Sequence, residues 1–126
     1  MKKDWLEATQ TGNCKVVRSL IDKGADINAL DIHGQTALMN AALRGDASLV
    51  KELAAHGANL NHTAKYNLTA LMLAVINDHK EIVEILVKAG ANIELKGSKG
   101  PFEYSPIEYA IKNGKEEIVS ILKGKI

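Results

Sequence analysis

The stretch from Asp31 to Asn61, DIHGQTALMNAALRGDASLVKELAAHGANLN, decides the fold of this 126-residue chain. Its ending, GANLN, has a counterpart on each side: GADIN begins at Gly24 and GANIE begins at Gly90, each 33 residues away in phase. The sequence TALM at Thr36 recurs at Thr69, again after 33 residues. A fixed period between about 20 and 50 residues indicates a stack of structural repeats.

Each period holds two short apolar patterns of helical spacing, separated by glycines such as Gly45. Helices of this size fall below the roughly 12–15 residues that even marginal stability in isolation requires. They persist only if each pair buries its apolar side against the next pair. The sequence therefore predicts an all-α repeat fold, a solenoid, with Leu53 and Leu86 among its central core residues.

These phased residues resemble the ankyrin repeat, whose pattern is DxxGxTPLHxAAxxGHxxIVxxLLxxGADxN. The resemblance covers almost the whole chain and implies an ankyrin-like stack of helix-turn-helix units joined by short hairpin loops. Two departures fall at turns: Asn67 stands where the preceding repeat has Gly34, and Asp78 replaces the glycine between the helices. Asparagine tolerates the left-handed conformation better than most residues, whereas Asp78 is expected to be strained.

We predict a single domain spanning residues 1–126. Its repeats run over approximately residues 1–30, which form an N-terminal cap, then 31–63, 64–96 and 97–126, the last a C-terminal cap. The first repeat lacks the hairpin half, and Trp5 is expected to cover the end of the stack, with a role as a ligand platform as the alternative. Lys123 occupies a position that is apolar in the other repeats, which suggests that the stack closes there.

The fourth repeat departs from the period. Ser105 follows Thr69 by 36 residues, so the hairpin KGSKGPFEY carries a three-residue insertion. Ser105, Pro106 and Glu108 together predict a strong helix start, with a serine cap, a proline in the first turn and a capping box.

Composition limits the function. The net charge of +1 gives no general attraction to nucleic acid or to an anionic membrane. No apolar run is long enough to span a bilayer, and the start of the chain does not resemble a signal peptide. With Cys14 as its single cysteine, the chain suits a reducing compartment. We expect a cytoplasmic monomer, with signal-independent export as an effector left open.

The sequence offers no set of residues for catalysis. Cys14 has no histidine at a matching offset, and the four histidines belong to two other repeats: His33, His56 and His62 to the second, and His79 to the third. The GSKG at Gly97 lacks the spacing of a phosphate-binding loop. We therefore expect no catalytic residue, no metal and no cofactor. The alternative is an enzyme, or an accessory subunit that contributes a residue to an enzyme's site.

The resemblance implies a non-enzymatic protein-binding module, an adaptor, scaffold or inhibitor, that holds a partner on a concave face. In ankyrin-repeat proteins this face is lined by the hairpin tips and the ends of the first helices. Mapped by phase, it comprises Ile32, His33, Gln35, Leu43, Arg44, Lys65, Tyr66, Leu68, Ile76, Asn77, Lys99, Phe102, Tyr104, Lys112 and Asn113.

The charged members of this set are basic, which predicts a partner segment that is apolar with acidic flanks. Two alternatives remain open at this stage. Phe102 and Tyr104 could brace the lengthened hairpin of the fourth repeat instead of binding a partner. The whole chain could also be a structural or homo-oligomeric unit, or a piece of a longer array.

Overall fold

The computed structural model describes residues 2–98 and 100–124. Over these residues the chain forms eight α-helices and two 3₁₀ turns, with no strand. The all-α repeat prediction is confirmed. The helices are α1 (Lys3–Thr11), α2 (Cys14–Asp22), α3 (Ala37–Arg44), α4 (Ala47–Ala55), α5 (Ala70–Ile76), α6 (Lys80–Ala89), α7 (Pro106–Lys112) and α8 (Glu116–Lys123), and the turns are η1 (Lys65–Asn67) and η2 (Gly100–Phe102).

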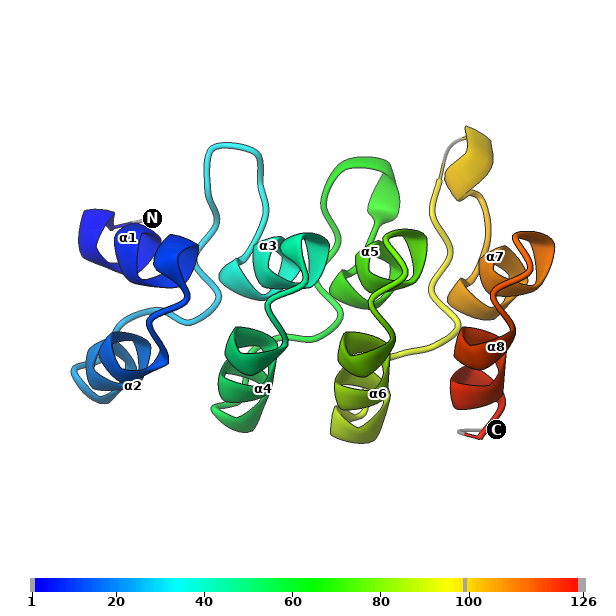
Figure 1. Ribbon diagram of the computed structural model, residues 1–126. Helices are drawn as coiled ribbons and strands as arrows, with labels where there is room; N and C mark the ends of the chain where they lie inside the picture. Colours follow the sequence, from blue (N-terminus) through cyan, green and yellow to red (C-terminus); the bar gives the residue numbers. More distant parts are fainter. Residues whose placement is uncertain (1, 99, 125–126) are drawn as a thin grey trace.

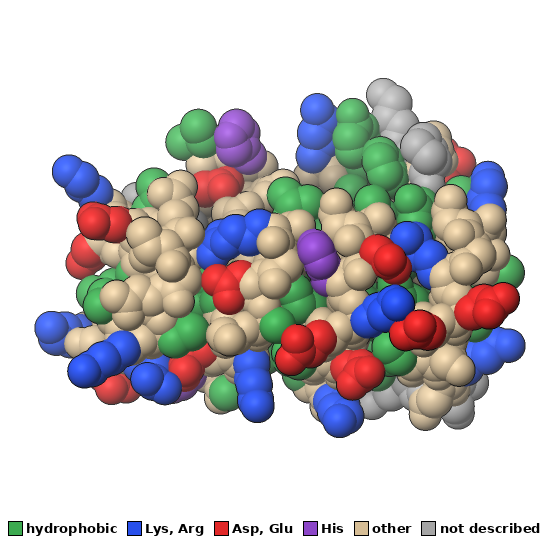
Figure 2. Space-filling model, viewed as in Figure 1, with side chains coloured by type: hydrophobic (Ala, Val, Ile, Leu, Met, Phe, Trp, Pro, Cys, Tyr) green, Lys and Arg blue, Asp and Glu red, His purple; other side chains and the backbone are tan. Residues whose placement is uncertain are grey.

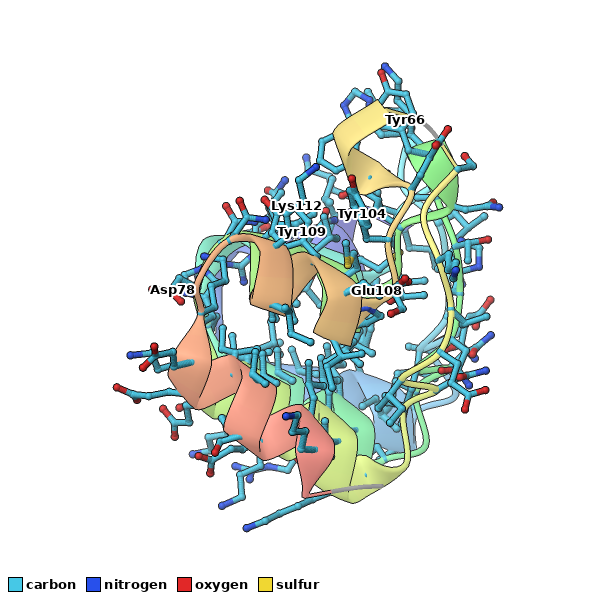
Figure 3. The ribbon with its side chains drawn as sticks, turned by 90° about the vertical axis from the view of Figure 1, so that its right-hand side faces the viewer. Tyr66, Asp78, Tyr104, Glu108, Tyr109 and Lys112 are labelled. Carbon is cyan, nitrogen blue, oxygen red and sulfur yellow. The ribbon has the colours of Figure 1, made fainter. Side chains whose placement is uncertain are left out.

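The helices lie in two rows (Figure 1). The first helices of the pairs, α1, α3, α5 and α7, contact one another in series, and the second helices do the same. Each first helix also packs against the second helix that follows it. The loops that join successive pairs rise past the row of first helices and end in hairpins, so they form an arm at an angle to the helices (Figure 3).

Hydroxyl caps set the start of α3, α5 and α7. The side chains of Thr36 and Thr69 each accept a hydrogen bond from the backbone amide three residues later, at 3.2 Å. Ser105 accepts from the amide of Glu108 at 3.3 Å, and the Glu108 carboxylate accepts from the amide of Ser105 at 3.0 Å. The predicted capping box is therefore confirmed. These bonds satisfy donors that a helix start otherwise leaves free.

One apolar core runs the length of the stack between the two rows. Leu53 and Leu86 are fully buried, as predicted. Trp5 is 2% exposed, so it packs into the core at the first repeat. The largest side chains with almost no exposure come from every repeat: Val17, Leu38, Met39, Leu49, Val50, Leu53, Leu71, Met72, Ile82, Leu86, Ile118 and Leu122.

The turn between paired helices requires a positive φ. Gly45 has φ 85° at this position, and Asp78, which replaces the glycine one repeat later, has φ 61°. Asp78 is thus held in the left-handed region, as predicted, and Lys115 of the next repeat lies 3.7 Å from its carboxylate. This ion pair offers the aspartate an interaction that a glycine could not make.

The repeated GADIN, GANLN and GANIE tails are joined in series by hydrogen bonds between an asparagine side chain of one tail and the backbone of the next. The side-chain oxygen of Asn28 accepts from the amide of Asn59 at 2.8 Å, and that of Asn61 accepts from the amide of Asn92 at 2.8 Å. Each bond joins one repeat to the next. The 33-residue recurrence of these tails therefore reflects a contact between neighbours as well as the turn that ends the helix.

Candidate protein-binding surface

We define the hairpin face as the hairpin tips together with the adjoining exposed side of α1, α3, α5 and α7. Figure 2 shows hydrophobic side chains, with basic and histidine side chains, standing along the upper edge where the hairpins project. Below that edge, charges of both signs are interspersed over the side of the stack.

The first hairpin is held by Asp31. Its Oδ1 accepts from the backbone amides of His33 at 2.8 Å and Gln35 at 3.0 Å, and its Oδ2 accepts from the side chain of Asn40 at 2.9 Å. Partial burial acts to raise the pKa of Asp31, but the hydrogen bonds from Asn40, Gln35 and His33 outweigh it, and the pKa is lowered. The tip between these bonds carries Ile32, whose side chain is 95% exposed.

A groove of about 350 Å³ lies between α1 and the first hairpin. Leu6 and Leu30 supply apolar walls, and Ile32 stands at its edge. Its polar lining comes from Gln10, Asp31 and His33. Sites that bind a side chain or small ligand are commonly apolar with a few polar groups, and this groove has that character.

The second and third hairpins are joined by aromatic stacking. The rings of Tyr66 and Phe102 are stacked with centroids 5.6 Å apart and planes 25° from parallel. The amide of Ser98 also donates to the carbonyl oxygen of Tyr66 at 2.8 Å. Tyr66 and Asn67 both have positive φ, at 63° and 57°. Asn67 replaces a glycine in this way, as predicted, whereas the left-handed conformation of Tyr66 was not predicted.

Tyr104 and Lys112 make a second contact near α7. The ammonium nitrogen of Lys112 lies 2.6 Å from the hydroxyl oxygen of Tyr104. Tyr109 lies on the same side of α7 (Figure 3) and is half-buried. Tyr109 is not among the predicted residues; its position corresponds to Asn40 and Leu73 in earlier repeats. Four of the five aromatic residues therefore belong to the second and third hairpins and α7.

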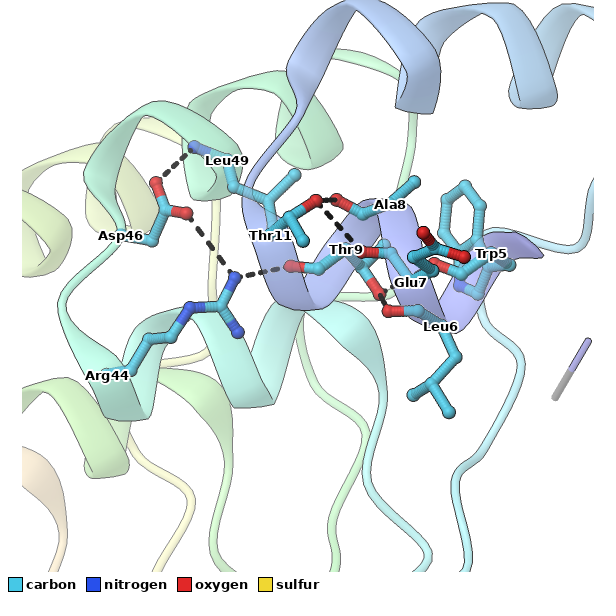
Figure 4. Close-up of polar contacts among 9 residues, drawn as sticks. All are labelled: Trp5, Leu6, Glu7, Ala8, Thr9, Thr11, Arg44, Asp46 and Leu49. Atoms are coloured by element: carbon cyan, nitrogen blue, oxygen red, sulfur yellow. Dashed lines mark hydrogen bonds and ion pairs between the residues drawn. The ribbon is translucent and has the colours of Figure 1, made fainter. Parts of the chain in front are cut away.

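Arg44 makes a contact between repeats that was not predicted. Its Nη2 donates to the carbonyl oxygen of Thr9 in α1 and lies 3.4 Å from the carboxylate of Asp46 (Figure 4). The Thr9 carbonyl belongs to the last turn of α1 and also accepts from the amide of Gly12 at 3.3 Å. Arg44 thus connects the first and second repeats through its Nη2, while its side chain is 35% exposed.

Leu68 is a second correction. Its side chain is 8% exposed and packs against the core, because it directly precedes the buried cap residue Thr69. The amide groups of Asn77 and Asn113 donate to carbonyl oxygens of their own helices, at 2.8 and 2.9 Å. These two side chains are exposed, but each uses one amide donor to bond a carbonyl group near the end of α5 or α7.

The remaining predicted residues reach the surface to different degrees. Lys99 lies outside the described residues. Exposed side chains are those of Ile32, His33, Leu43, Lys65 and Lys112, and half-buried ones are those of Gln35, Tyr66, Ile76, Phe102 and Tyr104.

The geometry of paired helices and hairpins agrees with a comparison against protein families. A family model described as ankyrin repeats, in three copies, matches residues 5–97. The chain belongs to the ankyrin-repeat family. Ankyrin repeats are generally protein–protein interaction modules, and the family is typically non-enzymatic. A search of curated proteins found no match.

The histidines of this ankyrin stack make contacts between and within repeats. A ring nitrogen of His62 lies 3.1 Å from the carbonyl oxygen of Gly34, and one of His79 lies 3.2 Å from that of Leu43. His56 lies 3.1 Å from the carboxylate of Glu52, four residues earlier. The described residues contain no group of three or more potential ligands placed to hold a metal ion.

Cys14, the single cysteine of the chain, is half-buried. Burial, followed by the nearby carboxylates of Asp46 and Glu52, raises the pKa of the Cys14 thiol. A raised pKa disfavours the thiolate, which is the reactive form of cysteine.

Among the described residues, no helix combines the length and apolar character needed to cross a membrane.

Proposed function

We propose that this ankyrin-repeat chain is a non-enzymatic module that holds a partner protein on its hairpin face, as an adaptor, scaffold or inhibitor. The observation that carries the proposal is the exposure of Ile32. An ordered turn holds this large apolar side chain in water, beside the groove lined by Leu6 and Leu30. Burial of such a surface by a partner is favourable because apolar area is removed from water.

The rigidity of the neighbouring hairpins supports the same proposal. Stacking between Tyr66 and Phe102 joins the second hairpin to the third, and the bonds of Asp31 fix the first. A surface that is already ordered loses little conformational entropy when a partner binds. Tyrosine is also favoured at such contacts because it buries a large area and keeps a polar end.

The partner segment that fits best is apolar with acidic flanks. The apolar contribution comes from Ile32 and Leu43, and the basic contribution comes from Lys65 and Lys112. Arg44 adds a third basic group, although its Nη2 contacts Thr9 and Asp46. The net charge of +1 favours a protein partner over nucleic acid or an anionic membrane. We propose that the chain acts as a monomer in the cytoplasm.

Affinity capture with matched variants tests the proposal. The immobilised wild-type chain, Ile32→Asp and Lys51→Ala are exposed to the same native lysate, and the recovered proteins are compared by mass spectrometry. Lys51 is exposed on α4, which lies in the other row of helices. We expect a partner that the wild type and Lys51→Ala retain equally and that Ile32→Asp loses, while circular dichroism shows all three folded. Equal retention by Ile32→Asp would place the binding surface elsewhere.

A further inference from the structure

Tyr104 and Lys112 form a contact whose chemistry is incomplete within the chain. The Lys112 nitrogen is 2.6 Å from the hydroxyl oxygen of Tyr104 but 4.7 Å from the centre of its ring. The contact is therefore mainly a hydrogen bond at the edge of the ring, and attraction to the ring face is secondary. It joins the end of the third hairpin to the end of α7 (Figure 3).

The direction of this hydrogen bond follows from the groups involved. A lysine ammonium has three donors and no acceptor, so the oxygen of Tyr104 must be the acceptor. The tyrosine's own proton is not used in this bond and is available to another acceptor. Lys112 likewise keeps two further N–H groups. Two donors, one of them charged, thus lie side by side at one point of the hairpin face.

The carboxylate of Glu108, four residues before Lys112 in α7, is occupied elsewhere. The carboxylate of Glu108 accepts from the amide of Ser105 at 3.0 Å and lies 3.4 Å from the ammonium of Lys96. In residues 2–98 and 100–124, no acceptor for the hydroxyl proton of Tyr104 and no carboxylate paired with Lys112 is found within bonding distance. The pair is therefore suited to an acceptor that comes from outside the chain.

We propose that Tyr104 and Lys112 together bind the carboxylate of an aspartate or glutamate in the partner segment. One carboxylate oxygen accepts from the Tyr104 hydroxyl and the other from the Lys112 ammonium. The inference rests on the proposed function, and it assigns the acidic flank of the partner to the α7 end of the hairpin face. Hydrogen bonds with a charged group are roughly twice as strong as those between neutral groups, so this contact selects acidic residues.

Selection from a random displayed peptide library tests this assignment. Peptides are selected on the wild-type chain and on Tyr104→Phe/Lys112→Met, which keeps the ring and the lysine's apolar stem but removes both donors. Lys51→Ala, on the opposite row, is the matched control. We expect aspartate or glutamate to be enriched at one position of the wild-type and Lys51→Ala peptides, and this enrichment to disappear with the double variant.

A binding cycle with one selected peptide gives the second measurement. Changing its enriched acidic residue to the corresponding amide should weaken binding to the wild type about tenfold, and binding to the double variant by less than about twofold. Equal losses on both chains, or wild-type peptides without acidic enrichment, would overturn the carboxylate site.

Ile32→Asp separates this inference from the proposed function. If peptides are lost on Ile32→Asp but show no dependence on Tyr104 and Lys112, the hairpin face stands and the carboxylate site fails. If the folded wild-type chain selects no peptide, the proposed function and the carboxylate site both fail. If its peptides bind Ile32→Asp with full affinity but depend on Tyr104 and Lys112, the carboxylate site stands and the proposed binding at Ile32 fails.

Discussion

The imidazole of His79 lies against Gly45, so close that a Cβ added at position 45 would be 2.8 Å from the ring. The same ring is 3.2 Å from the carbonyl oxygen of Leu43. The histidine thus closes the joint between the second and third repeats, and the absence of a side chain at position 45 makes room for it. Gly45 is therefore favoured for two reasons: its φ of 85° suits glycine, and a side chain at this position would clash with the His79 ring.

The first prediction follows from this joint. Gly57 has a similar φ of 82°, but a Cβ added there would meet nothing within 4 Å. Gly57→Ala should therefore lower the free energy of unfolding by about 1–2 kcal/mol, the cost of a left-handed alanine. Gly45→Ala should lower it by about 1–3 kcal/mol more because of the clash. Denaturant unfolding measures both, and His79→Ala in the Gly45→Ala background should recover part of the difference. Equal losses at the two glycines would contradict the close packing.

The second prediction concerns the contact of Arg44 with the carbonyl of Thr9. Arg44→Ala should destabilise the first repeat by about 1 kcal/mol, since a charged donor to a helix end is lost from a partly exposed site. Amide hydrogen exchange should quicken in α1 and stay unchanged in α6. Arg18→Ala is the control, because Arg18 makes an exposed ion pair with Glu52 at 3.0 Å that should contribute less. Unchanged exchange in α1 would mean that Arg44 does not hold the first repeat.

The third prediction tests the core at Leu53. Leu53→Asp would place an unpaired charge in a fully buried position and should lower the free energy of unfolding by several kcal/mol. Lys51→Ala, two residues away on the same helix and exposed, should change it by no more than about 0.5 kcal/mol. Thermal melting followed by circular dichroism is the measurement. An unchanged melting temperature for Leu53→Asp would refute the assignment of the core.

The fourth prediction is a dependence on pH at Asp31. Its pKa in the folded state lies below the ordinary value of 3.8, so the unfolded state binds the proton more readily. The stabilisation is therefore complete above that value and is lost as the pH falls through the folded pKa. The difference in unfolding free energy between the wild type and Asp31→Asn should be larger at about pH 6 than at about pH 3. A difference that does not change with pH would contradict the role of the carboxylate.

Repeat phase predicted the fold well because the residues that recur make the same contacts in each repeat. Thr36 and Thr69 cap equivalent helices, and Leu53 and Leu86 occupy equivalent core positions. Phase also placed Asp78 at a turn that needs a positive φ. These features depend on position within the repeat, which the sequence shows directly.

The candidate site was harder to predict because its contacts join particular side chains across repeats. Arg44 occupies a surface position by phase, yet its guanidinium reaches the carbonyl of Thr9. The stacking of Tyr66 on Phe102 depends on the left-handed φ of Tyr66 and on the lengthened third hairpin. Tyr109 was missed as well, because its counterparts Asn40 and Leu73 are not among the predicted residues.

The most direct test of partner binding is to map the contact by solution NMR of the isotopically labelled chain, with a captured partner or selected peptide added. Backbone amide signals should shift in the hairpins, at residues 31–35, 64–68 and 97–104, and at the adjoining ends of α1, α3, α5 and α7. Signals of α4 and α6 should stay in place. Shifts confined to α2, α4, α6 and α8 would show that the partner binds the opposite row, and the hairpin face would then have no part in binding.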